Sequence, residues 1–519
     1  MQDLVFDIIH SMSKNEKGFF RKYSRIHSGK DAKTYLLLFD VLDGMKTYDE
    51  SELKKKALKF IPERLLPATK NYLKNNLVKT LRLFHEEISP EVEINNKLTS
   101  IEIFFRRRLK EHCRREIAAT RRLIEAHELY RYLHQLAFWE RQLLRNDPQS
   151  KESHAGSEIL HREERANLDR LKNVVEIEAL AERLYHITFS VGNIRNEETL
   201  QEIRAIFDHP LMQDENRPLT TCTKITYYNM HSKYGELVND LPHVYDSLSK
   251  SIRLLHEREE FRQANTGKYI HALYNFMMVS IWLNRNDAYF EAYENFRNIP
   301  GTLKKSPSPT LLEVHRMLLL NIRIYYFSRN FLFDEIILLH DVQGKNILQK
   351  KPAIYAHVHL ETCCSFASAL FATGNLKGAL KWINKVINEA RNDLRKDLLA
   401  SMRLLNLLVH YELGNDVLLL YEIRSTERYL AKIGRKEKSE TSLVKFIRLL
   451  LEYPGEKKNR QADLNMIYEE TASLRNHDFE KNAFQDIDLV PWMKAKVNGT
   501  DYTEAYRNMR SLPVAASAG

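Results

Sequence analysis

Apolar residues recur at every third or fourth position along most of this chain, which is the spacing of one face of an α-helix. The segment 68–85 shows the pattern at Tyr72, Leu73, Leu77, Leu81 and Phe84. A four-residue spacing continues through Ile101, Phe105, Leu109, Cys113 and Ile117. The pattern predicts an all-α fold, with one continuous helical face over 101–117.

Several short helices are predicted at the start of the chain. Ser13 and Glu16 have the spacing of a capping box, in which each side chain bonds the backbone N–H of the other residue. Pro62 and Pro67 mark a break before the helix at 68–85. Three helices with a basic last one resemble a helix-turn-helix, and they equally resemble a small helical cap.

From about residue 220 the pattern becomes repetitive. An apolar, aromatic helix leads to a short polar turn and then to a second amphipathic helix. The predicted turns follow one another at intervals of 40 to 47 residues, at Asn239-Asp240, Asn286-Asp287, Arg329-Asn330, Gly374-Asn375 and Gly414-Asn415. A recurring unit of this length is typical of a helical repeat array.

The clearest unit runs from residue 366 to 387 and resembles a tetratricopeptide (TPR) repeat. The matching features are small Ala367, the turn Gly374-Asn375, and Ala379 followed four residues later by Ile383. Three features depart from the TPR pattern: Cys363 stands where it has Trp, Leu370 stands where it has Tyr, and the closing Pro is absent.

The resemblance covers roughly residues 220 to 430, and the whole arrangement also resembles uncharacterised bacterial TPR-like proteins. It implies a right-handed α-solenoid of TPR-like hairpins with a small helical N-terminal region. Stacked hairpins of this kind present an extended concave binding surface.

Five segments are predicted along the chain, with the loop at 146–150 as the strongest boundary. They are an N-terminal helical region (1–97), a basic helical hairpin region (98–150), long polar helices (151–219), TPR-like repeats (220–435), and C-terminal capping helices with a tail (436–519).

Composition agrees with a helical, cytoplasmic protein. Gly (16) and Pro (14) are scarce in 519 residues, whereas folds with many turns need both. We expect no secretory signal, no membrane span and no disulfide framework. The cysteines Cys113, Cys222, Cys363 and Cys364 are expected to be buried thiols in a reducing cytoplasm.

Positive charge is concentrated in one stretch. The net charge is +10, and the segment 106–122 holds eight basic residues opposed by only Glu111 and Glu116. These residues are Arg106, Arg107, Arg108, Lys110, Arg114, Arg115, Arg121 and Arg122. One interpretation is a site for an anionic partner, since Arg pairs with phosphate or carboxylate oxygens through two hydrogen bonds. The other is a solvated helix face that acids on neighbouring helices partly neutralise.

The sequence lacks the common catalytic and cofactor-binding motifs. The sequence contains no G-x-x-x-x-G-K-[ST] or G-x-G-x-x-G loop, no H-E-x-x-H and no G-x-S-x-G. His357 and His359 have a spacing that suits neither one helix face nor a metal site. We therefore predict no enzyme activity, no catalytic residues, no cofactor and no metal.

The predicted function is protein–protein interaction, as a scaffold or adaptor that uses the concave surface of the repeats. The alternative is nucleic-acid or ribonucleoprotein binding through the basic N-terminal third. The many aromatics at helical positions are expected mainly between helices, or else in a groove that binds a peptide. No membrane partner or small-molecule substrate is evident.

Overall fold

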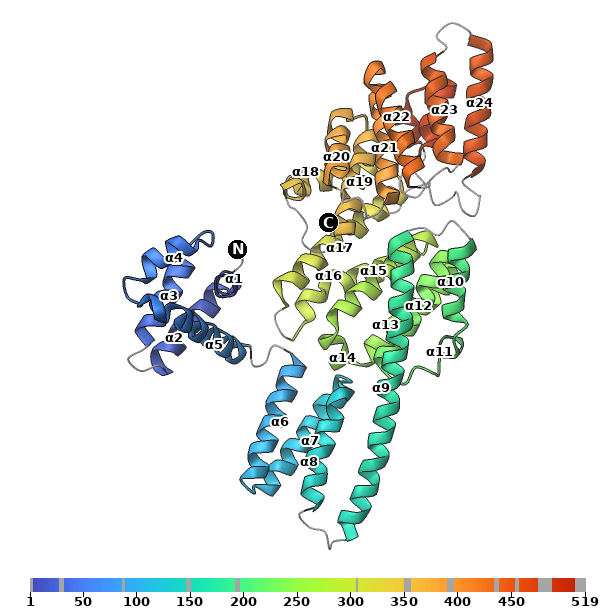
Figure 1. The fold of residues 1–519 in the computed structure, drawn as a ribbon. Helices are drawn as coiled ribbons and strands as arrows, with labels where there is room; N and C mark the ends of the chain where they lie inside the picture. Colours follow the sequence, from blue (N-terminus) through green and yellow to red (C-terminus); the bar gives the residue numbers. More distant parts are fainter. Residues whose placement is uncertain are drawn as a thin grey trace. The chain divides into compact units, whose positions relative to one another are not determined.

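The protein is all-α, as predicted. The computed structural model describes residues 3–27, 32–85, 89–145, 151–191, 197–304, 307–349, 356–389, 396–433, 438–452, 457–474 and 488–508, and these form helices and no strand (Figure 1). The chain divides into two compact units, Met1–Leu168 and Asp169–Gly519. The division falls inside one long helix, α9 (Lys151–Val191). The predicted boundary loop at 146–150 lies outside the described residues.

The first unit begins with five helices around a core of their own, which includes Phe20, Leu38, Phe39 and Leu73. They are α1 (Leu4–Ser11), α2 (Lys14–His27), α3 (Ala32–Asp43), α4 (Glu50–Ala57) and α5 (Leu66–Phe84). The predicted capping box is confirmed, because Ser13 N donates to Glu16 Oε2 (2.5 Å) and Glu16 N donates to Ser13 Oγ (3.3 Å).

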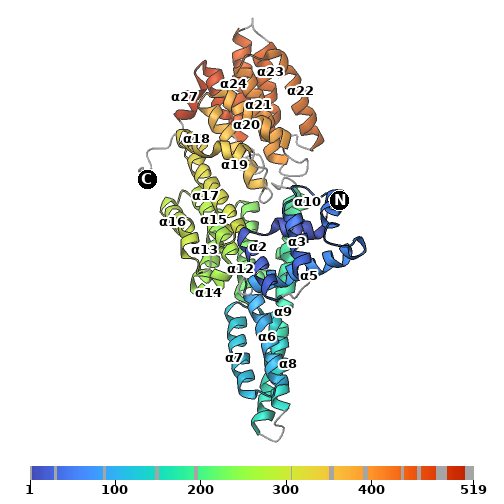
Figure 2. The ribbon, with the colours of Figure 1, turned by 90° about the vertical axis from the view of Figure 1, so that its left-hand side faces the viewer.

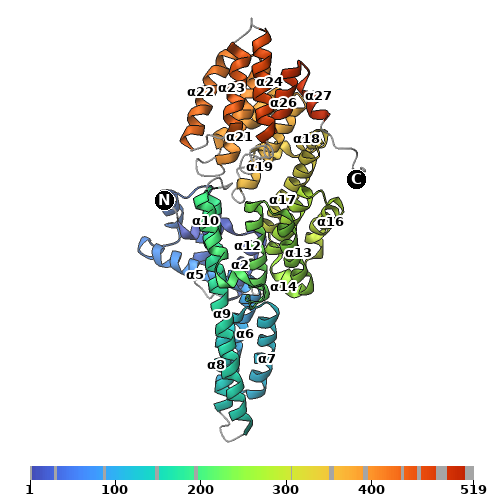
Figure 3. The same ribbon diagram turned by 90° about the vertical axis from the view of Figure 1, so that its right-hand side faces the viewer.

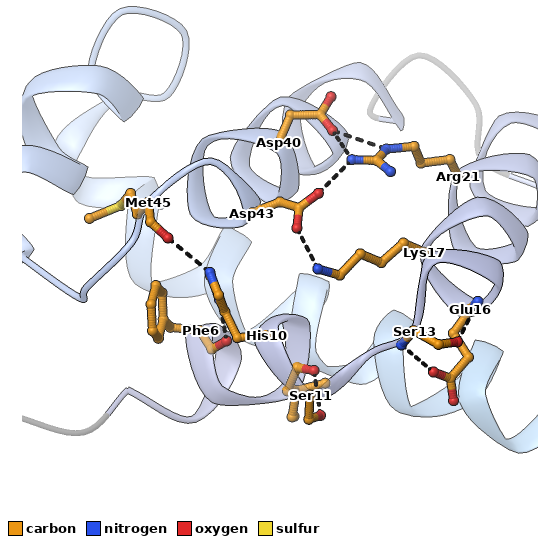
Figure 4. Close-up of polar contacts among 11 residues, drawn as sticks. Phe6, His10, Ser11, Ser13, Glu16, Lys17, Arg21, Asp40, Asp43 and Met45 are labelled. Carbon is orange, nitrogen blue, oxygen red and sulfur yellow. Dashed lines mark hydrogen bonds and ion pairs between the residues drawn. The ribbon is translucent and has the colours of Figure 1, made fainter. Parts of the chain in front are cut away.

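Ion pairs join α2 to α3 (Figure 4). Lys17 Nζ lies 2.7 Å from Asp43, and the Arg21 guanidinium lies 2.8 Å from Asp43 and 2.9 Å from Asp40. Burial would raise the pKa of Asp43, but hydrogen bonds from Lys17 and Arg21 outweigh burial, so this pKa lies below its ordinary value. Lys17 and Arg21 therefore stabilise the packing of α2 against α3.

Three further helices and the start of α9 complete the first unit: α6 (Pro90–Arg106), α7 (Lys110–Ala126) and α8 (Leu133–Arg145). The α6 and α7 helices form a hairpin, and α8 packs against both (Figure 2). Ile101, Cys113 and Ile117 meet in one buried cluster of this bundle.

The prediction of one continuous helical face over 101–117 is wrong, because α6 ends at Arg106. Arg108 has a left-handed backbone (φ 60°). Leu109 N donates to Phe104 O and Arg108 N to Phe105 O, each at 2.9 Å. These two bonds form a Schellman motif, which terminates a helix. The four-residue spacing survives the turn, since Cys113 and Ile117 fold back onto Ile101 instead of extending its face.

The second unit is a series of helical hairpins, each with a first and a second helix. After α10 (Glu197–Phe207) and the short α11 (Pro210–Gln213) come α12 (Thr221–Val238) with α13 (Leu241–Glu257), and then the short α14 (Glu259–Ala264). The next hairpins are α15 (Thr266–Trp282) with α16 (Asn286–Thr302), α17 (Pro309–Arg329) with α18 (Phe333–Gln349), and α19 (Ala356–Ala372) with α20 (Leu376–Glu389). The last two are α21 (Lys396–Glu412) with α22 (Asp416–Lys432), and α23 (Lys438–Glu452) with α24 (Lys457–Ser473).

From α15 onward, the first helix of each hairpin contacts the first helix of the next: α15 contacts α17, α17 contacts α19, α19 contacts α21, and α21 contacts α23. The small residues of the unit at 366–387 lie between helices, since Ala367 and Ala379 are fully buried. Absence of a large side chain at these positions lets α19 and α20 approach closely.

The hairpin turns of this unit share one geometry. A residue with a left-handed backbone ends the first helix at Asn239, Asn284, Phe331, Gly374 and Gly414. The turns predicted at 239–240, 374–375 and 414–415 are confirmed. The turn predicted at 286–287 lies two residues earlier, and the one predicted at 329–330 is centred on Phe331. The sequence signal failed there because a bulky residue rarely adopts this backbone.

Two short C-terminal helices, α26 (Val490–Asn498) and α27 (Tyr502–Arg507), pack back onto the hairpins. The α26 helix contacts α24, and α27 contacts α19 (Figure 3). Trp492 is fully buried, and its Nε1 donates to Glu412 Oε1 on α21 at 2.6 Å. Tyr502 stacks on Phe371 of α19. These helices are therefore part of the core of the last hairpins.

Candidate functional site

Seven of the eight basic residues predicted as a binding site are exposed. They lie on the α6–α7 hairpin, around the turn at 107–109 and along α7, and are Arg106, Arg107, Arg108, Lys110, Arg114, Arg115 and Arg122. Two of them form ion pairs with residues of their own helix: Arg106 with Glu102 at 2.6 Å, and Arg114 with Glu111. We call these seven residues the basic hairpin.

The side chains of five members of the basic hairpin form no hydrogen bond or ion pair with any other described residue: Arg107, Arg108, Lys110, Arg115 and Arg122. Glu116, one of the two opposing acids, pairs instead with Lys97 at 3.0 Å. Within the part of the chain that the structure describes, most of this positive charge is therefore uncompensated, and it can attract an anion.

Arg121 is the exception and belongs to the interior of the bundle. Its side chain is 26% exposed, and its guanidinium lies 2.7 Å from Glu140 of α8 and 3.0 Å from Glu163 of α9. Burial raises the pKa of Glu140 above its ordinary value, although the positive charge of Arg121 opposes this shift. These ion pairs join α7 to α8 and α9, so the structure gives Arg121 a role in the fold, and its binding of a partner stays a prediction.

A groove of about 490 Å³ lies between α6 and α8, beside the basic hairpin. Its walls include Leu98 and Glu102 of α6 and the aromatic pair Phe138 and Trp139 of α8. Phe138 is 44% exposed, which is unusual for a large apolar side chain. We call this the α6/α8 groove. Sequence reasoning missed it because Phe138 reads as one more apolar position of an amphipathic helix.

A second hollow, of about 240 Å³, lies in the second unit. It is lined by four successive first helices, with Trp282 on α15, Tyr325 on α17, Ser368 on α19 and Leu405 on α21. We call the surface formed by α15, α17, α19 and α21 the first-helix face. Residues from four hairpins thus line one site, although the first and last of them, Trp282 and Leu405, are more than 120 positions apart in the chain.

The first-helix face combines aromatic and polar groups. Tyr325 accepts a hydrogen bond from the Trp282 indole, and Asn321 bonds both Tyr274 (2.5 Å) and Thr362 (3.4 Å). These bonds fix the polar groups across neighbouring hairpins. Exposed Arg329 lies at the same hollow as Glu361 and Asp488, so charges of both signs border it. Such a surface suits a polypeptide, which carries apolar, hydrogen-bonding and charged groups together.

Of the cysteines and the histidine pair at 357 and 359, most of the described side chains are buried. Cys113, Cys363 and Cys364 are buried, and burial raises the pKa of the Cys113 thiol, which disfavours the nucleophilic thiolate. His359 is buried, and the side chain of His357 lies outside the described residues. The described part of the chain contains no group of three or more His, Cys, Asp or Glu side chains placed to hold a metal ion.

Among the described helices, none is long and apolar enough to cross a membrane. No protein-family model, curated protein or solved structure matches the chain. The fold and these surfaces define an all-α hairpin protein with one mixed polar and aromatic face and one exposed basic hairpin.

Proposed function

We propose that this chain is a non-enzymatic, cytoplasmic scaffold or adaptor that binds a protein partner. In this proposal the hairpins from α12 to α24 form a right-handed, TPR-like α-solenoid, and the first-helix face is its concave binding surface. The observation that carries the proposal is that four successive first helices contact one another and jointly line one hollow.

Three further features support this function. The hollow is bordered by aromatic side chains and Arg329, the residue types that dominate binding energy at protein interfaces. The burial of the Cys113, Cys363 and Cys364 thiols is consistent with a reducing compartment. The hydrogen bonds of Asn321 hold neighbouring hairpins in register, so a partner meets a preorganised surface.

The test is affinity purification of the tagged protein from its native cells, with and without nuclease, at low and high salt. A variant carrying Arg329→Glu and Ser368→Arg changes the first-helix face. A matched control, Val417→Arg with Tyr421→Arg, changes exposed residues of a second helix, α22. We expect at least one salt-resistant partner to be lost from the first variant only. Identical partners for both variants would contradict the proposal.

Nucleic-acid binding through the basic hairpin is a second candidate function. The observation that favours it is the exposure of seven cations, five of which have no ion-pair partner among the described residues. Each phosphate that a cation neutralises releases a counterion, so binding must weaken steeply as salt rises. Partners recovered only at low salt, and lost with nuclease, would favour this function over the scaffold.

A further inference from the structure

The α6/α8 groove leads directly to arginines of the basic hairpin. Asn95, Thr99 and Glu102 line the groove on α6 at helical spacing, and Arg106 continues the same face one turn later. Glu102 confirms this continuity because it pairs with Arg106 at 2.6 Å.

The α8 wall ends in the same way. His134 and Phe138 line the groove four residues apart, and exposed Arg145 lies on the same face two turns after Phe138. The α6 and α8 helices run in the same direction, with α7 antiparallel to both (Figure 1). Both walls of the groove therefore end in exposed arginines, at the end of the bundle that carries Arg107 and Arg108.

Phe138 is held in place although it is exposed. Its ring meets the ring of Trp139 edge-on, with centroids 5.1 Å apart, and Trp139 packs against Phe105 at 5.5 Å. Phe105 belongs to α6, so these aromatic contacts join α8 to α6. An exposed ring that is already ordered loses little conformational entropy when another ring stacks on it.

We infer that the α6/α8 groove and the basic hairpin form one site for single-stranded nucleic acid. A base stacks on Phe138, and the neighbouring phosphates pair with the arginines at the groove end. Charge complementarity selects the occupant: the groove opens onto Arg106, Arg107, Arg108 and Arg145, of which only Arg106 pairs with an acid among the described residues. A duplex hides its base faces, so a stacking site favours a single strand.

This inference rests on the second candidate function and adds the substrate class to it. The sequence shows the cluster of basic residues, but it shows no aromatic residue placed within that cluster to stack on a base. The fold adds the aromatic, because it places Phe138, which lies on the helix after the arginine cluster, on the wall opposite Glu102. Glu102 also shields Arg106, and a phosphate must compete with its carboxylate for that guanidinium.

The test is fluorescence anisotropy of the full chain with a fluorescein-labelled oligouridylate, and with the same strand annealed to oligoadenylate. We expect the single strand to bind about tenfold tighter than the duplex. Phe138→Ala should weaken single-strand binding about tenfold and leave duplex binding unchanged, whereas Phe138→Tyr keeps the aromatic face and should restore affinity. Tyr421→Ala, which removes an exposed aromatic of the second unit, is the matched control.

A charge-reversal pair separates this inference from the function on which it rests. One variant replaces Arg107, Arg108, Lys110 and Arg115 with Glu; its control replaces Lys54, Lys55, Lys56 and Lys59 of α4 and the turn that follows it, with the same change in net charge. Loss of all binding only in the first variant supports the second candidate function. Equal binding of both strands and no effect of Phe138→Ala would overturn the inference alone.

Two other results would overturn the proposal more broadly. If neither strand binds at low salt, the second candidate function and the inference both fail. If polyglutamate displaces the single strand at equal charge concentration, the site recognises acidic polymers in general, and the assignment to nucleic acid is wrong.

Discussion

The adjacent residues Arg121 and Arg122 have different roles, although both are arginines. Arg121 and Arg122 are identical in type and belong to the same basic cluster of the sequence. Arg121 pairs with Glu140 and Glu163 inside the bundle, whereas Arg122 is exposed. On a helix, successive side chains point about 100° apart, so one of two neighbours can face another helix while the other faces solvent.

We predict opposite effects for replacing these two residues. Arg121→Gln should lower the free energy of unfolding by about 2 kcal/mol, because it leaves the carboxylate of Glu140 buried without its cation. Arg122→Gln should change stability by less than about 0.5 kcal/mol. Urea unfolding followed by circular dichroism measures both. Equal stability of the two variants would contradict the assignment of Arg121 to the fold.

At the scale of elements, helix ends decide the architecture. Residues with a left-handed backbone close hairpins in both units, at Arg108 in the first and at Gly374 in the second.

Packing between distant segments decides where the C-terminal helices lie. Trp492 and Met493 are fully buried, and α26 and α27 contact hairpins that precede them by many residues. A segment expected to cap the end of the array is therefore integrated into its core.

Removal of the Trp492 side chain tests this integration. Trp492→Ala should lower the free energy of unfolding by about 3 to 5 kcal/mol, because it opens a cavity and deletes the bond to Glu412. Tyr421→Ala, at a 63% exposed position of α22, should cost less than about 0.5 kcal/mol. Thermal unfolding by circular dichroism provides the comparison. A small effect at Trp492 would mean that α26 is peripheral.

At the scale of the whole molecule, the two units have buried clusters of their own. Leu38 belongs to a cluster within the first unit, and Trp492 to a cluster within the second. Each unit is also served by a separate candidate surface, the basic hairpin with the α6/α8 groove in the first and the first-helix face in the second. This division assigns the two candidate functions to different units.

Independent clusters predict that unfolding is not a single two-state transition. In differential scanning calorimetry, Leu38→Ala should lower the temperature of one transition, since truncating a fully buried Leu costs about 2 to 5 kcal/mol. Trp492→Ala should lower the temperature of another. One transition that both variants shift equally would refute independent unfolding of the units.

Much of the fold follows from local patterns. The all-α class, the capping box at Ser13 and Glu16, and three of the five repeat turns were predictable, because each depends on residues within a few positions of one another. The turn at Phe331 was placed inexactly, since no local signal marks a bulky residue in a left-handed backbone. The break at Arg108 was missed because apolar spacing continued through it.

The candidate sites likewise combine features that local sequence determines with features that depend on contacts between helices. The amino-acid sequence suffices to identify the helical periodicity, three of the hairpin turns and the cluster of basic residues, because all three are properties of neighbouring positions. The fold is needed to expose seven of those cations, to pair Arg121 with Glu140, and to place Phe138 opposite Glu102. These outcomes depend on how α6, α7 and α8 pack against one another, and spacing within one helix carries no information about which residue of another helix a side chain meets.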